Sequence, residues 1–156
     1  MSSGVTHLYG NLIFGTAITG TVLWLQPDLA ASVFIGAVAG MIITPDLDIN
    51  HETITEQIMN QVPFLGWLFG QAWYGYALIA NHRGLSHNLF LGTLGRVAWT
   101  LLISLVTLIF LFGLLQLIGI SFDPIAVMRG LTLVLLNPVT LLAWFAQDVL
   151  HYILDI

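Results

Sequence analysis

Four long apolar stretches, separated by shorter polar ones, dominate the chain. The first two cover about residues 8–25 and 29–43, and each is followed within two residues by a proline. The third, 97–119, contains no charged residue, and the fourth follows Pro124. A helix that crosses a membrane needs about 20 mainly apolar residues. We therefore predict a single all-α domain over residues 1–156, a polytopic membrane helical bundle with about four transmembrane helices (8–25, 29–43, 84–119 and 125–155).

Three positions refine this prediction. The first two stretches are short for full crossings, so a re-entrant hairpin is an alternative for them. Gly36 and Gly40 stand four residues apart, a spacing that lets two helices approach closely. Pro138 interrupts the last stretch and predicts a kink or break there.

The stretch 44–81 is the only long segment with a mixed polar and aromatic character. Trp and Tyr side chains favour the headgroup zone of a bilayer. We therefore expect this segment to form a lid on the membrane surface, with Trp67, Trp73, Tyr74 and Tyr76 as interfacial aromatics.

Composition supports a membrane protein and excludes some partners. Charged residues make up 7% of the chain, whereas a soluble domain carries about 25%. The net charge of −5 and the absence of lysine argue against nucleic acid as a partner. The absence of cysteine excludes disulfides and thiolate metal ligands.

The ionisable residues lie almost entirely where an apolar stretch begins or ends. Four crossings would bring the following residues to one membrane face: His7, Asp46, Asp48, His82, Arg83, His87, Asp148, His151 and Asp155. Ionisable groups grouped at a bilayer indicate a functional site. Arg83 and Arg96 would lie on this face and Arg129 on the other, which favours the cytoplasmic side of an inner or plasma membrane for the site.

The spacing within each group suggests metal ligands. Asp148, His151 and Asp155 stand at i, i+3 and i+7 and therefore share one face of a helix. Acid and imidazole groups on one face suit a metal ion, or a histidine oriented by carboxylates. Asp46 and Asp48 follow Pro45 as a pair of carboxylates, although a capping turn is the simpler interpretation of that pair alone.

The segment HRGLSH supplies two more imidazoles and a guanidinium. His82 and His87 converge only if a helix begins near Gly84, which permits the necessary turn. The forked guanidinium of Arg83 suits a phosphate or a carboxylate. His7, taken alone, is a structural polar residue more often than a ligand, but its predicted position beside the other groups favours a ligand role.

Charge balance then predicts the cofactor. Four carboxylates on one face need compensation, and about two divalent cations with neutral imidazoles would provide it. Histidine and aspartate without cysteine suit zinc first, and also manganese or iron. Two metals clamp the oxygens in many phosphoryl transfers. Arg83, as the ligand of the phosphate oxygens, and Asp48 are the candidate catalytic residues.

At these motifs the chain resembles a family of small membrane metal-binding proteins. The resemblance rests on SSGVTH, PDLD after an apolar segment, HRGLSH before the next, and the pair His151 and Asp155. That family is akin to inner-membrane metal-dependent hydrolases and, more distantly, to zinc-dependent phospholipase C and zinc single-strand nucleases. The resemblance implies a helical fold with a multi-metal site, with ligands His7, Asp46, Asp48, His82, His87 and His151, and also Asp148 and Asp155.

Two functions fit these observations. The first is a membrane-embedded metal-dependent hydrolase of a phosphate ester, either a lipid headgroup or a lipid-linked phosphate. Its expected partners are membrane lipids, and the sequence is compatible with an oligomer. The second is a non-catalytic metal-binding membrane protein that acts as a sensor, carrier or partner-binding module. Ion transport is disfavoured because 97–119 offers no ionisable residue for a path to the other side.

Overall fold

The computed structural model of the chain describes residues 4–48, 54–80, 88 and 90–155. All regular structure in these ranges is helical, as the apolar pattern predicts. The elements are α1 (Gly4–Leu25), α2 (Pro27–Ile42), the 3₁₀ turn η1 (Pro45–Asp48), α3 (Ile54–Met59), α4 (Pro63–Ile79), α5 (Leu91–Leu117), α6 (Pro124–Leu135) and α7 (Pro138–Leu154).

Proline and short polar side chains set several of the helix starts. Helices α2, α4, α6 and α7 each begin at a proline, which lacks the N–H that a first helical turn would leave unpaired. The Asp123 carboxylate caps α6 by accepting from the backbone N–H groups of Ile125 and Ala126 at 2.9 and 3.1 Å. The break predicted at Pro138 is confirmed, because α6 and α7 are bent by 59° relative to one another.

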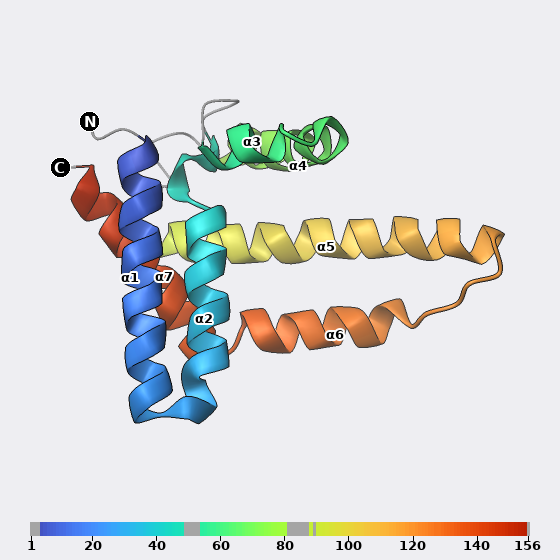
Figure 1. Ribbon diagram of the computed structural model, residues 1–156. Helices are drawn as coiled ribbons and strands as arrows, with labels where there is room; N and C mark the ends of the chain where they lie inside the picture. Colours follow the sequence, from blue (N-terminus) through green and yellow to red (C-terminus); the bar gives the residue numbers. More distant parts are fainter. Residues whose placement is uncertain (1–3, 49–53, 81–87, 89, 156) are drawn as a thin grey trace.

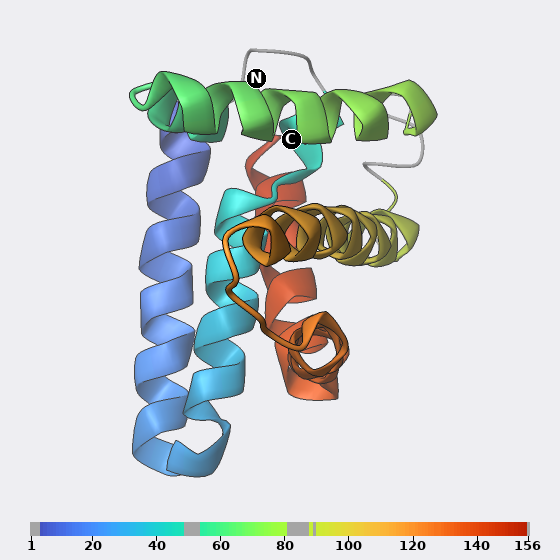
Figure 2. The same cartoon turned by 90° about the vertical axis from the view of Figure 1, so that its right-hand side faces the viewer.

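Two parts make up the molecule (Figure 1). Helices α1, α2 and α7 lie side by side as a three-helix body, in which α1 runs antiparallel to α2 and α7. Helices α5 and α6 form a hairpin, here called the arm, that projects crosswise from this body. In Figure 2 the arm is seen end-on while α1 and α2 still stand upright. Helix α4 lies across the end of the body where α1 begins.

Two glycines hold α2 against α7 with almost no space between them. A Cβ atom added at Gly36 would lie 2.2 Å from the Thr140 carbonyl oxygen, and one added at Gly40 would lie 2.7 Å from the Cβ of Gln147. Only glycine permits this approach at either position. The spacing of Gly36 and Gly40 therefore marks a close contact between α2 and α7.

The predicted lid segment contains η1, α3 and α4, and two of the four aromatic residues predicted as interfacial are buried. Trp73 and Tyr76 are 4% and 3% exposed and pack with Leu47 in one core cluster. Trp67 and Tyr74 remain 59% and 46% exposed. The interfacial assignment was wrong for Trp73 and Tyr76, because the second half of α4 packs onto η1 and needs those rings as its core.

Four parallel crossings are not found in the described part of the chain. Two helices, Val5–Leu25 and Leu91–Leu117, are long and apolar enough to cross a membrane, and the bent pair α6 and α7 would make a third. Helix α2 is apolar but shorter. Because α1 and α5 lie crosswise (Figure 1 and Figure 2), they cannot both follow one membrane normal in this arrangement. Hydropathy predicts the length of a span but not its direction.

Candidate metal centre

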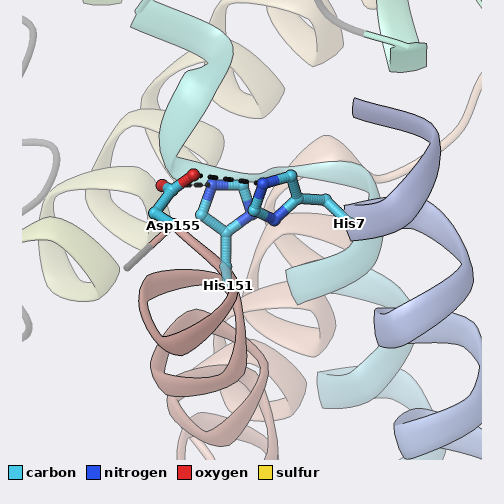
Figure 3. A group of neighbouring side chains, drawn as sticks. All are labelled: His7, His151 and Asp155. Atoms are coloured by element: carbon cyan, nitrogen blue, oxygen red, sulfur yellow. Dashed lines mark ion pairs between the residues drawn. The ribbon is translucent and has the colours of Figure 1, made fainter. Parts of the chain in front are cut away.

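Three chain segments meet at one end of the body. Because α1 runs antiparallel to α2 and α7, the first turns of α1 meet η1, which follows α2, and the last turn of α7. The structure thereby brings together four of the predicted ligands: His7, Asp46, His151 and Asp155. Figure 3 shows the side chains of His7, His151 and Asp155 pointing toward one another.

Two imidazoles face two carboxylates at short range. The Nε2 atom of His7 lies 3.1 Å from Asp155 Oδ1, and the Nε2 atom of His151 lies 3.2 Å from Asp46 Oδ2. A third contact joins His151 Nε2 to Asp155 Oδ2 at 3.6 Å. The two rings lie against each other, with centroids 4.2 Å apart. Both carboxylate oxygens of Asp155, the carboxylate of Asp46 and both rings therefore belong to one compact group.

Burial differs between the two kinds of ligand. His7 and His151 are 5% and 1% exposed, whereas the side chains of Asp46 and Asp155 keep 28% and 31% of their surface. The imidazoles thus form the inner wall of the cluster and the carboxylates its outer rim. Among the described residues of the cluster, the carboxylates are therefore the side that remains accessible.

The donor set and its spacing suit a divalent cation. Ligand atoms of His7, His151 and Asp155 all lie within 4.8 Å of one another. A tetrahedral ion with ligands at about 2.1 Å holds them roughly 3.4 Å apart. The nitrogen–oxygen contacts of 3.1–3.6 Å are near this spacing, with His7 and His151 each contacting a different oxygen of Asp155. Two ionised carboxylates and two neutral imidazoles carry a charge of −2, which one divalent cation neutralises. The number of ions, about two by the sequence analysis, stays a prediction.

Asp148 lies outside this cluster, although it was predicted as a ligand. It is 4% exposed, and its Oδ2 atom accepts hydrogen bonds from the Thr93 hydroxyl and from the guanidinium of Arg96. Arg96 is itself 1% exposed. A buried carboxylate is stable only with such a partner. The structure therefore shows Asp148 joining the start of α5 to α7, while its role as a metal ligand stays a prediction.

Sequence analysis missed Arg96 and Thr93 as partners of Asp148. One signal was available, because Arg96 begins an apolar segment that carries no other charge through residue 119. An arginine in that position needs a counter-charge. Its burial also removes it from the count of surface charges that favoured a cytoplasmic site.

The remaining predicted residues cannot be placed. His82, Arg83 and His87 lie outside the described residues, as does the side chain of Asp48, whose backbone ends η1. Their predicted roles, as further ligands and as the phosphate-binding and catalytic groups, stay predictions.

The pattern of one protein family matches residues 2–156, and that family is described as uncharacterized metal-binding protein (DUF2227). The chain belongs to this family. Membership agrees with the structure, because the described residues include a group that could hold a metal ion, formed by His7, His151 and Asp155. No curated protein and no solved structure matches the chain.

Proposed function

We propose that His7, His151 and Asp155 bind a divalent cation, with Asp46 as a fourth ligand or its neighbour. The observation that carries this proposal is the contact of two buried imidazoles with each other and with a shared carboxylate. Family membership supports metal binding. Zinc suits two nitrogens and one or two oxygens best, and manganese or iron suits them next.

We further propose that this centre hydrolyses a phosphate ester. A divalent cation held there would supply Lewis-acid polarisation of a phosphoryl oxygen. The buried rings of His7 and His151 would fix the ion from within, and the part-exposed carboxylates of Asp46 and Asp155 would face the approaching ester. Arg83 would bind the phosphate oxygens, and Asp48 would complete the catalytic set beside a second ion.

The substrate is proposed to reach the site from a membrane. Helix α5 has a mean hydropathy of 2.5 over its best window, and only 6% of that window is buried. Such an exposed apolar helix has no stable place in water. We propose that α5 lies in a bilayer, so that the phosphate ester is a lipid headgroup or a lipid-linked phosphate.

Metal content tests the first proposal. Tag-free protein prepared without chelators should retain about one divalent ion or more per chain by elemental analysis. Asp155→Asn should lose most of it, because the amide keeps the shape of the carboxylate but not its charge. Asp28→Asn is the matched control, since Asp28 is exposed at the start of α2, at the other end of the body. Metal-free parent protein, or equal loss in both variants, would refute the site.

Hydrolysis separates the two candidate functions. Asp46 favours the non-catalytic alternative, because a fourth protein ligand would close the coordination sphere as in structural sites. We expect metal-dependent cleavage of a short-chain phospholipid or of bis(p-nitrophenyl) phosphate, abolished by Asp155→Asn. Full metal content without cleavage of either ester would favour a sensor, carrier or partner-binding role.

A further inference from the structure

A groove of about 300 Å³ runs between α1 and α2, on the inner side of the metal cluster. Its lining comes from one face of α1, from α2 and from Gln147 of α7. Asn11 stands one helical turn after His7, and Gln147 stands one turn before His151. The polar end of the groove therefore lies directly beneath the two imidazoles of the cluster.

Two amide side chains at this end keep unused acceptors. Asn11 and Gln147 are each 1% exposed. The Gln147 Nε2 atom donates to the backbone carbonyl of Asn11 at 3.1 Å. The side-chain oxygens of both residues have no hydrogen-bond partner among the described residues. A buried acceptor without a donor is unfavourable, so a ligand whose donors reach these oxygens gains affinity here.

Apart from the hydroxyls of Thr16 and Thr19, the rest of the groove is apolar. Small residues keep it open: a Cβ added at Gly15 would meet Gln147 Nε2 at 2.6 Å, whereas one added at Gly20 meets nothing within 4 Å. Nine residues separate Asn11 from Gly20, so the groove follows α1 for about 13 Å. That length and the volume of about 300 Å³ suit one extended hydrocarbon chain of about ten carbons.

We propose that this groove binds the hydrocarbon chain of a single-chain amphiphile whose polar end carries hydroxyl or amide N–H donors. Those donors would bind the oxygens of Asn11 and Gln147, and any phosphate beyond them would point at the metal cluster one turn away. As a statement about the substrate of that cluster, the proposal rests on the proposed function. Binding of the chain itself requires no metal.

The test uses 1-monodecanoylglycerol, which offers two hydroxyl donors, and its dimethyl ether, which offers none. Binding to the full chain is measured by calorimetric titration in a sterol-based detergent, which presents no competing alkyl chain. The diol should bind about tenfold more tightly than the ether, as two net hydrogen bonds imply. Equal binding of the two would overturn the role of Asn11 and Gln147.

Two leucine substitutions locate the chain. Gly20→Leu fills the open end of the groove and should weaken diol binding at least tenfold. Gly113→Leu is the matched control, because Gly113 in α5 also has open space around it and does not line the groove. Unchanged binding in Gly20→Leu, or equal weakening in both variants, would show that the chain lies elsewhere and overturn the proposal.

The same titrations distinguish this proposal from the metal centre. Asp155→Asn should lose the metal and keep diol binding, since Asp155 does not line the groove. Diol binding without any metal in the parent protein would leave the groove standing and refute the metal centre. Bound metal without diol binding would refute the groove alone.

Discussion

Replacing Gly36 by alanine tests whether the contact between α2 and α7 positions the metal centre. The added Cβ would lie 2.2 Å from the Thr140 carbonyl oxygen and 2.8 Å from the Cβ of Ala143. An ordinary contact of carbon with oxygen is about 3.3 Å or longer, so the helices would have to separate by about 1 Å. Because the obstacle is a backbone atom, no change of rotamer can remove it.

The expected cost follows from this overlap. Overpacking a core costs about 1–3 kcal/mol, and a backbone obstacle puts Gly36→Ala near the upper end. Alanine gains about 1 kcal/mol of helix propensity over glycine. The net loss of about 2 kcal/mol should lower the Tm by about 4–8 °C for a chain of this size.

Thermal unfolding in detergent measures this change, with Gly20→Ala as the control. Gly20 lies in α1 with nothing within 4 Å of an added Cβ, so its replacement should raise stability by about 0.5–1 kcal/mol. Separation of α2 from α7 also moves Asp46 away from His151, so metal affinity should fall about tenfold in Gly36→Ala. Equal Tm values for Gly36→Ala and the parent protein would refute the close helix contact.

Three further substitutions test other contacts of the fold. Arg96→Met should destabilise the fold by about 3–5 kcal/mol, because it leaves the Asp148 carboxylate buried without a counter-charge. A double variant that also carries Asp148→Leu should recover most of this loss in the same unfolding assay. Leu47→Ala should lower the free energy of unfolding by about 2–5 kcal/mol, since Leu47 is 1% exposed beneath α4, and it should weaken metal binding through the neighbouring Asp46. Metal affinity equal to that of the parent protein would show that η1 does not position that ligand. Ile109→Arg, at a site 60% exposed on α5, should disfavour insertion of α5 into a membrane by about 2.5–3.5 kcal/mol, measured as a gain in protease cleavage within α5 in proteoliposomes. Equal cleavage in the parent protein and the variant would place α5 outside the bilayer.

The convergence of ligands at one end of the body was readable from the sequence for a simple reason. Helices α1 and α2 each end shortly before a proline, and successive helices joined by short turns run antiparallel, so the start of α1 and the end of α2 had to meet. The end of α7 joins them, which brings His151 to Asp46 across more than a hundred residues of sequence.

The direction of α5 was not readable in the same way. Its composition reports only that it is apolar, and every face of such a helix packs equally well against lipid or protein. What fixes it is a few contacts near its beginning, the ion pair of Arg96 with Asp148 and the hydrogen bond from Trp99 Nε1 to the Ala72 carbonyl oxygen. Such contacts join residues far apart in the sequence, so a local sequence pattern does not predict which residues pair.

Asp148 illustrates the same limit within the site. Its spacing from His151 predicted a shared helix face, and spacing says nothing about which neighbour a side chain meets. Arg96 and Thr93 reach it from another helix, so this carboxylate holds two helices together, while its role as a ligand stays a prediction.

Helix α7 connects the arm to the metal centre. It begins at the bend that ends α6, it carries Asp148, which binds the base of α5, and it finishes with His151 and Asp155. The start of α5 and the end of α6 are therefore both attached to α7, the helix that carries two of the ligands. A surface that fixes the direction of the arm therefore also fixes the direction in which the exposed carboxylates of the metal centre face.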